Sequence, residues 1–317
     1  MASLAPTQFY RGPHPNLWFL IFYLMASSTL AQHDSIPTAV EALELRSAGY
    51  NITFENTEDP TWFREVRLRK YDGVVFLSTT GEILDAEGKT AFQNYLNKGG
   101  NFVAIHSASD SLNTTTFYGQ EVGAYFDYHP PISRATVNVL TKAHPSTSML
   151  PDRWEVTDEM YNFKSDPRSV GAVVILSADE STYTDPGPRK FDQGQPHPTA
   201  WYQKRGAGVQ SGGLAGRSFY TSLGHLNETW QDELFLSHVF GGITWALDSG
   251  TTKASNPAAD LGRPATTSTS SSSLPNPSKT NAPSSTMQRY SVAVLSMVLR
   301  VHMAHHGLSC LPALNDQ

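Results

Sequence analysis

Residues 99–110 read GGNFVAIHSASD, and their order is typical of one class of fold. After Asn101, the run Phe102–Ile105 is continuously apolar, as expected for a parallel strand that is buried on both faces. Two glycines precede the run, and His106 with Ser107 follows it directly. In α/β sheets, ligands bind at the carboxyl ends of the strands, so the turn at His106 is expected to belong to a functional site.

The segments on either side alternate between strand and helix patterns. Val74–Leu77 is a second continuously apolar run, and Asp85–Lys98 carries Phe92, Tyr95 and Leu96 at helical spacing. Further helices are expected at 36–48 and 230–247, and further strands at 51–54, 135–140, 172–176, 199–203 and 218–221. This alternation predicts an α/β fold with a doubly wound, mostly parallel sheet, in a single domain over residues 32–250.

The composition excludes several function classes. The chain has 317 residues and a formal net charge of −6, which argues against a nucleic-acid partner. A single cysteine, Cys310, lies in the tail, so a disulfide scaffold, a Cys-based zinc site and a thiol nucleophile in the domain are all excluded. Catalysis would then depend on histidines, carboxylates and hydroxyls.

The amino-terminal segment allows two interpretations. The apolar stretch Leu17–Ala26 is too short to span a bilayer, and Thr29 and Ala31 after it are small enough for signal-peptidase positions. This pattern is typical of a secretory signal, residues 1–31, cleaved after Ala31, and predicts an extracellular or cell-surface protein. Alternatively, Phe19–Leu24 is the first strand of the sheet and the protein is cytoplasmic.

The carboxyl-terminal part differs in composition from the domain. From Pro264 to Thr286, 17 of 23 residues are Ser, Thr or Pro, so residues 251–290 are expected to form a disordered stalk. The weakly apolar tail, residues 291–317, is either a GPI-anchor signal or a plain disordered tail. A GPI anchor is the only membrane attachment that we expect for this chain. Sequons at Asn51, Asn113 and Asn227 predict N-glycosylation of a secreted chain.

Polar clusters follow several of the expected strands, and we expect them to meet at one edge of the sheet. They are His33–Ser35, Ser78–Gly81, His106–Asp110 and Gly224–His225. In this arrangement His106 and His225 would serve as acid and base, or as hydrogen-bonding partners of a sugar. Ser107 with His225 as its base is an alternative, although the glycines of a G-x-S-x-G elbow are missing. A structural His106 that donates to a loop carbonyl is another.

Asp158 and Glu159 form a further candidate pair. Adjacent carboxylates point in different directions, so we expect only one of them to face a ligand. Such a carboxylate would orient the imidazole of His106 or His225 and set its tautomer. The alternative is a helix cap or a solvated turn.

Within the domain, three His-Pro pairs begin at His129, His144 and His197. Proline keeps the preceding residue extended, so each imidazole can point into a cleft, and three imidazoles could bind a metal. Among the histidines of the domain, no His-x-His or His-x-x-x-His spacing supports such a site, and no cofactor is otherwise indicated. Trp201, shortly after His197, is a candidate platform for a sugar ring, with core packing as the alternative.

Taken together, these motifs resemble the ThuA-like (trehalose-utilisation) family over nearly all of residues 33–247. The matching segments are 33–37, 76–81, 99–110, 118–119, 123–126, 144–147, 158–163, 197–198 with Trp201, and 224–225. The resemblance implies a flavodoxin-type fold of the class I glutamine-amidotransferase-like group and a link to disaccharide utilisation. This sequence has no cysteine at the turn after Ile105, so thiolate-dependent glutamine hydrolysis is disfavoured. It also departs from the family pattern where the first strand is expected.

The resemblance carries over His33, His106, Asp110, Asp158, Glu159 and His225 as pocket residues. We therefore predict a hydrolase or lyase that acts on a small sugar or glycoside. The expected catalytic residues are His106, His225, Asp158 and Glu159, and the expected substrate-binding residues are His33, Asp34, Thr80, Ser107, Asp110, Tyr161, His197 and Trp201. A non-catalytic carbohydrate-binding surface protein and a metal-dependent hydrolase are the alternatives.

Overall fold

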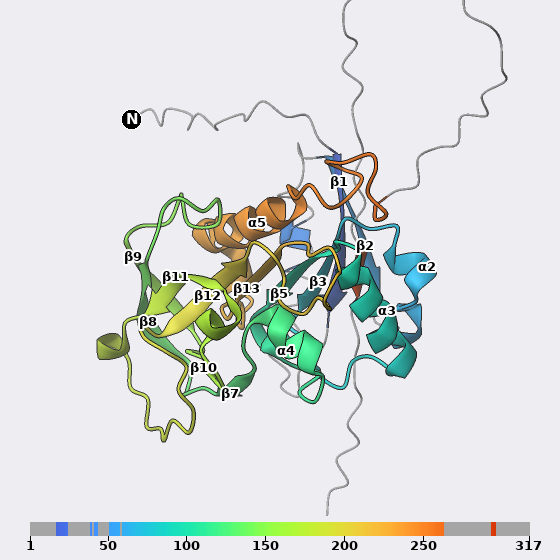
Figure 1. The fold of residues 1–317 in the computed structure, drawn as a ribbon. Coiled ribbons are helices and arrows are strands. Elements are labelled where there is room, and N and C mark those ends of the chain that lie inside the picture. The colour runs from blue at the N-terminus through green and yellow to red at the C-terminus, as the bar shows by residue number, and fades with distance from the viewer. Residues whose placement is uncertain are drawn as a thin grey trace, which may run out of the picture.

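The computed structural model describes residues 17–24, 39, 41–43, 51–57, 59–262 and 293–295, which Figure 1 shows as a coloured ribbon. Predictions for residues 1–16, for the region around Ala31 and for most of the stalk and tail lie outside these residues. No helix in the described ranges is both long enough and apolar enough to cross a membrane.

The strands belong to one large sheet and two small ones. The large sheet contains β1 (Leu17–Leu24), β2 (Asn51–Thr57), β3 (Gly73–Leu77), β5 (Asn101–Ile105), β8 (Ser133–Val139), β9 (Arg153–Asp158), β11 (Val173–Ala178), β12 (Pro198–Gln203), β13 (Ser218–Thr221) and β14 (Ala293–Leu295). Their order is β2-β1-β14-β3-β5-β13-β12-β11-β8-β9. The small sheets pair β4 (Thr80–Gly81) with β6 (Asp110–Ser111), and β7 (Phe126–Tyr128) with β10 (Asn162–Phe163).

The large sheet changes character at β13. The strands from β2 to β13 pair in parallel, whereas β12, β11, β8 and β9 pair antiparallel. The predicted α/β fold with a doubly wound, mostly parallel sheet is therefore confirmed. The antiparallel extension differs from the expectation, because the sequence of a short apolar strand does not reveal whether it pairs parallel or antiparallel with the next one.

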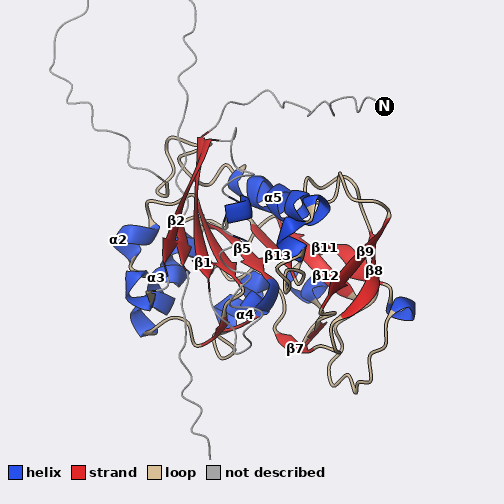
Figure 2. Ribbon diagram, turned by 180° about the vertical axis from the view of Figure 1, so that it is seen from behind, coloured by secondary structure: helices blue, strands red, loops and turns tan. Residues whose placement is uncertain are grey.

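Helices cover both faces of the parallel strands (Figure 2). They are α2 (Glu65–Leu68), α3 (Ala86–Asn97), α4 (Thr116–Val122) and α5 (Glu233–Leu247), and Ala39 and 41–43 are also helical. Phe102 of β5 packs against Phe92 of α3 and Tyr118 of α4. Phe219 of β13 pairs with Val103 instead, on the other face, and packs against α5 through His238.

Side-chain caps explain where the two long helices begin. The Asp85 carboxylate accepts from the Gly88 N–H at 2.6 Å, and the Asp232 carboxylate accepts from the Phe235 N–H at 2.7 Å. The last helix therefore begins at Glu233 and not at the expected Trp230, which lies in a separate 3-10 turn at 229–231.

Strand β1 occupies an interior position in the sheet. It pairs in parallel with β2 over Leu17–Ile21 and with β3 over Leu20–Leu24, and β14 pairs with both β1 and β3. Cleavage after Ala31 would remove β1, so the mature protein either keeps this strand or loses residues 1–31, but not both. Loss of the strand would leave unpaired backbone groups on β2, β3 and β14.

The folded part extends beyond the expected boundary at residue 250. Ala254 and Leu261 are buried, Thr252 bridges to Leu261, and the Gly262 N–H donates to the Arg69 carbonyl at 3.1 Å. Residues 251–262 therefore pack on the domain instead of beginning the stalk. The boundary was misplaced because this segment is polar and lacks helix or strand periodicity.

A buried carboxylate lies at the base of α4. Glu121 is 1% exposed, and its Oε2 accepts from the Gly208 N–H at 3.0 Å. Burial raises the pKa of Glu121 from 4.5 to about 7, and the Gly208 hydrogen bond opposes this shift. Gly208 and the nearby Gly206 admit the carboxylate because any Cβ at either position would collide with it.

A chain that begins at Gln32 lacks β1, and we expect it to lose cooperative thermal unfolding, as followed by circular dichroism, because β2, β3 and β14 each lose a partner. A chain that begins at Leu17 keeps β1 and is the control. Cooperative unfolding of the shorter chain at the temperature of the full chain would contradict the structure. Amino-terminal sequencing of the native protein then shows which form the cell makes.

Glu121→Gln should flatten the pH dependence of stability. Between about pH 4.5 and 7 the folded state keeps a proton on Glu121 that the unfolded chain releases, so this group lowers stability as pH rises. The loss in free energy of unfolding caused by Glu121 over this pH range amounts to at most about 3 kcal/mol. Urea unfolding at pH 5 to 8 measures it, with exposed Glu155→Gln as the control. Equal slopes for Glu121→Gln and the unmodified chain would refute the assignment.

Candidate functional site

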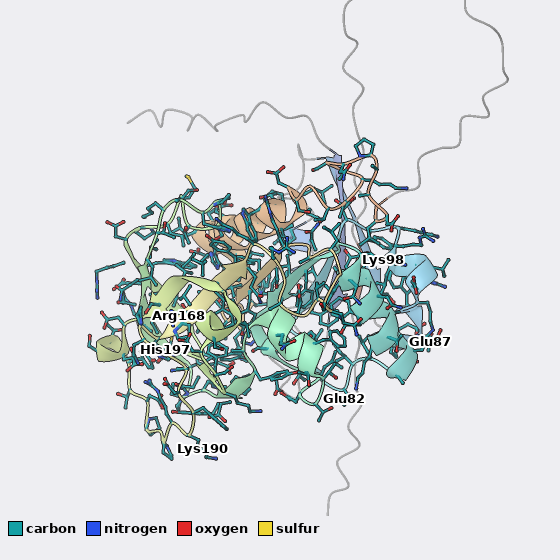
Figure 3. The ribbon with its side chains drawn as sticks, viewed as in Figure 1. Glu82, Glu87, Lys98, Arg168, Lys190 and His197 are labelled. Atoms are coloured by element: carbon teal, nitrogen blue, oxygen red, sulfur yellow. The ribbon has the colours of Figure 1, made fainter. Side chains whose placement is uncertain are left out.

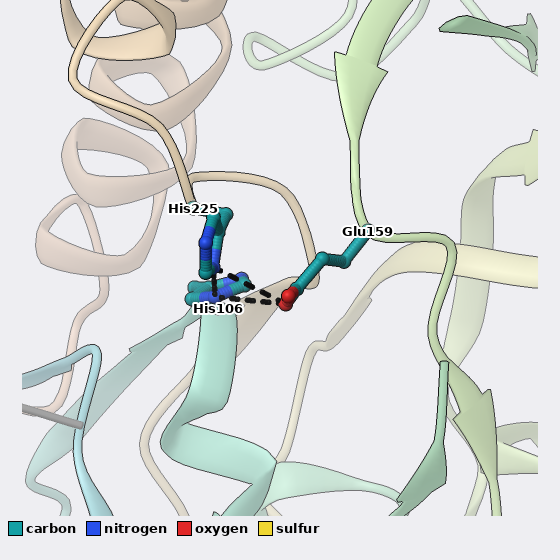
Figure 4. Close-up of side chains that lie close together, drawn as sticks. All are labelled: His106, Glu159 and His225. Carbon is teal, nitrogen blue, oxygen red and sulfur yellow. Dashed lines mark hydrogen bonds and ion pairs between the residues drawn. The ribbon is translucent and has the colours of Figure 1, made fainter. Parts of the chain in front are cut away.

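Three side chains meet where strands β5, β13 and β9 end, and we call them the His–Glu centre: His106, Glu159 and His225 (Figure 4). His106 Nε2 lies 3.3 Å from His225 Nδ1 and 3.6 Å from Glu159 Oε2. His225 Nδ1 lies 3.3 Å from the same Glu159 oxygen. All three residues are buried, with exposed fractions of 0, 7 and 6% in sequence order.

His106 is fixed from both sides. It directly follows β5 with a φ of 57°, a left-handed conformation that non-glycine residues rarely adopt and that is frequent at functional sites. Its Nδ1–H donates to the Ser222 carbonyl at 2.8 Å, so Nε2 faces the centre without a proton in the neutral ring. The Tyr161 hydroxyl donates to Nε2 at 3.1 Å. His106 therefore donates to a loop carbonyl, as in the structural alternative, and also faces the other two residues of the centre.

Asp158 holds the loop that carries His225. Its carboxylate accepts from the backbone N–H groups of Gly224 at 2.9 Å, of Glu159 at 2.8 Å and of His225 at 3.4 Å. Burial raises the pKa of Asp158 to about 6, and the Gly224 and Glu159 N–H groups oppose the shift. Asp158 was expected to be catalytic, but it contacts backbone, so it is a positioning residue.

Glu159 faces the imidazoles, so the adjacent carboxylates point in different directions as expected. Its Oε1 lies 3.3 Å from Nε2 of His129, a residue that sequence reasoning did not place beside the carboxylate. Burial would raise the pKa of Glu159, but the hydrogen bond to His225 and the nearby imidazoles lower it. The same hydrogen bond raises the pKa of His225, whereas burial lowers the pKa of His106 to about 4.

The curvature of the sheet brings Glu159 to the histidines. In the strand order β9 is four positions away from β13, a span of about 19 Å in a flat sheet. The contacts of Asp158 and Glu159 with the β13 loop and with His106 require the antiparallel strands to curl toward the ends of the parallel ones. The expected strand-end edge therefore includes a strand, β9, that the sequence analysis did not predict.

The other predicted site residues lie in different places. Thr80 and Asp110 bond to each other across β4 and β6, and Ser107 is buried beside His106 in the chain. Tyr161 belongs to the site through His106. His33 and Asp34 lie outside the described residues.

His197 and Trp201 are support residues and do not line the site. His197, which is labelled in Figure 3, directly precedes β12. Its Nε2 donates to the Tyr161 carbonyl at 2.8 Å, and its Nδ1 lies 2.8 Å from Oε1 of Glu180. Trp201 is 1% exposed and donates to the Val122 carbonyl at 2.7 Å. The prediction of a sugar platform at Trp201 is therefore wrong, because the indole is enclosed between strand and helix.

The three His-Pro histidines do not gather around one point. His129 reaches Glu159, whereas His144 stacks on Tyr202 with ring centroids 4.6 Å apart and bonds to Ser146. Among the described residues, the group of potential metal ligands that lie close enough to share an ion is the His–Glu centre. This centre could move protons between paired imidazole and carboxylate groups, or hold a cation.

The predicted glycosylation sites differ in exposure. Asn113 is exposed, and its side-chain amide donates to the Asp110 carboxylate at 3.0 Å. Asn227 is half-buried in the loop before α5, and the side chain of Asn51 lies outside the described residues.

Comparisons with known proteins identify the family of the chain and structures of similar fold. The sequence profile of the ThuA family, described as trehalose utilisation, matches residues 23–246. A ThuA-like protein from Bacteroides uniformis shares 20% identity at a TM-score of 0.59, covering 76% of this chain and 95% of that one. A ThuA-like protein from Parabacteroides merdae shares 18% identity at a TM-score of 0.52. The match covers 73% of this chain and 90% of that one. No curated protein matches the sequence.

Asp158→Ala should destabilise the protein, because buried backbone N–H groups lose their acceptor. With a cost of about 1–3 kcal/mol for an unsatisfied buried group, we expect a loss of about 3 kcal/mol in urea unfolding. Asp158→Asn keeps one acceptor oxygen and should lose less. Asp152→Ala, whose side chain is 90% exposed, is the control. A value for Asp158→Ala within about 0.5 kcal/mol of the unmodified chain would rule out this role.

Proposed function

This chain belongs to the ThuA family of trehalose utilisation, and on that premise we propose that it carries out acid–base chemistry on a disaccharide or glycoside at the His–Glu centre. The observation that carries the proposal is the convergence of two imidazoles and one carboxylate at the carboxyl ends of strands. Ligands bind at this edge in sheets of this kind.

The contacts of the centre suit proton transfer. A sugar offers hydroxyl and glycosidic oxygens, which give or take a proton as bonds to carbon form or break. Glu159 orients His225 through its Oε2, and the Ser222 carbonyl orients His106 so that its bare Nε2 faces the same point. Either imidazole can then exchange a proton with a sugar oxygen held between them.

The surroundings indicate where a ligand enters. The His106 side chain is fully buried, whereas the His129 side chain is 34% exposed and contacts Glu159. A sugar would therefore approach along His129, with the ring of Tyr161 beside it. The rings of His129 and Tyr161 stack with centroids 5.7 Å apart, which gives this approach an aromatic wall.

The turn after β5 excludes one reaction of related folds. Its first residue is His106, and Cys310 lies in the carboxyl-terminal tail. Glutamine hydrolysis through a thiolate therefore has no nucleophile in the domain.

We further propose that a mature chain cleaved after Ala31 acts outside the cell, and that a chain that keeps β1 acts in the cytoplasm.

His106→Ala and His225→Ala should each lower turnover of disaccharides, trehalose and oxidised disaccharides included, by at least about 100-fold, because each removes a proton-transfer group. Chromatographic product analysis with full-length protein measures the rate. His144→Gln, which changes a buried histidine outside the centre, is the control. Unchanged rates in both alanine variants would refute the mechanism. Sugar binding without any product in the unmodified protein would identify a carbohydrate-binding protein instead.

A further inference from the structure

We propose that the His–Glu centre binds one divalent transition-metal ion of the zinc class. The ligands are Nε2 of His106, Nδ1 of His225 and Oε2 of Glu159. The position of the ion rests on geometry alone, whereas its part in turnover rests on the function proposed above.

The first argument is the size of the triangle that the three donor atoms form. Its edges measure 3.3 Å, 3.3 Å and 3.6 Å. For bonds of about 2.0–2.1 Å at the tetrahedral angle, neighbouring ligand atoms lie about 3.3–3.4 Å apart. Octahedral coordination at about 2.1 Å gives about 3.0 Å. The triangle therefore fits three corners of a tetrahedron.

The second argument is the set of lone pairs that face this point. His106 donates its Nδ1–H to Ser222, so its Nε2 presents a lone pair to the centre. Glu159 Oε2 lies 3.6 Å away and also presents lone pairs. In this structure the Tyr161 hydroxyl donates to Nε2 of His106, and a proton on His225 Nδ1 serves Glu159. A cation between the three donor atoms would replace both hydrogen bonds, since it accepts a lone pair from each atom at once.

The third argument is the way the donors are held. Ligating imidazoles commonly donate their other N–H to a carbonyl or carboxylate, as His106 does to Ser222. The second oxygen of Glu159 contacts His129, and the backbone of His225 is fixed by Asp158. Each donor therefore has a partner that keeps it aimed at the centre.

The donor set also selects the ion. Two imidazole nitrogens and one carboxylate oxygen suit zinc and related transition metals, whereas magnesium and calcium prefer oxygen ligands. A buried carboxylate is costly without a counter-charge, and the ion would supply one. The hydrogen bond from the Tyr161 hydroxyl to His106 Nε2 must be given up on binding.

A bound ion would shift the role of proton acceptor from the imidazoles to an oxygen bound to the ion. Zinc lowers the pKa of a coordinated water to about 7, so the proton acceptor would be an oxygen at the fourth position. Glu159 and His225 would then act as ligands, and the acid–base chemistry would take place at the ion.

The experiment uses full-length protein stripped with EDTA and then supplied with Zn²⁺ or Co²⁺ alone. We expect one equivalent of metal by plasma mass spectrometry, and a cobalt absorption spectrum of the tetrahedral type. If stripped protein takes up neither ion in stoichiometric amount, the site is refuted whatever the variants show.

Variants then locate the ligands by competition with a chromophoric chelator. Glu159→Gln and His106→Ala should each weaken metal affinity by at least about 100-fold, and His129→Asn by about 10–100-fold, the usual effect of an outer partner. Tyr161→Phe should not weaken it, because it removes a competing hydrogen bond. Glu155→Gln and His144→Gln are the matched controls. Unchanged affinity in Glu159→Gln would overturn the assignment.

The two proposals fail separately. Stoichiometric metal with no product from any disaccharide refutes the proposed function and leaves the metal site intact. Undiminished disaccharide turnover by EDTA-stripped protein refutes a role of the ion in turnover and leaves the proposed function intact.

Discussion

The geometry of the His–Glu centre depends on the buried carboxylate of Asp158. Asp158 is the last residue of the edge strand β9, and its carboxylate accepts hydrogen bonds from backbone N–H groups in the loop after β13. It therefore links the outer edge of the antiparallel half to the parallel half of the sheet. Without this contact, neither Glu159 nor His225 would be held at the end of β5. One buried side chain therefore links the curvature of the sheet to the geometry of the site, because it satisfies donors that would otherwise be buried unpaired.

The parts of the fold that were predictable are those with local causes. The runs at Val74–Leu77 and Phe102–Ile105 show burial on both faces, and Asp85 marks a helix start through its cap. Strand β9 was missed although Trp154 and Asp158 alternate with exposed residues, because short alternation with charged residues is also common in loops. The direction and the curl of the antiparallel strands arise from long-range pairing, and no local pattern encodes them.

The site was predictable in part for the same reason. His106 and His225 follow strands directly, so strand-end reasoning finds them. The division of labour between Asp158 and Glu159, one on backbone and one on imidazoles, depends on where a loop distant in sequence passes. Trp201 shows the opposite error: its position near His197 suggested a surface, whereas pairing of β12 and β13 places it in the core beside Tyr220.

The change from parallel to antiparallel pairing at β13 has a dynamic consequence. The histidines belong to the parallel half, which is covered by helices on both faces, whereas Glu159 follows β9 at the open edge of the sheet. Edge elements with few neighbours open at a lower free energy than the interior. Transient detachment of the β8–β9 hairpin would withdraw Glu159 from both imidazoles while the remaining strands stay paired. In mild denaturant, Glu159 should accordingly separate from the histidines before the parallel half loses its secondary structure.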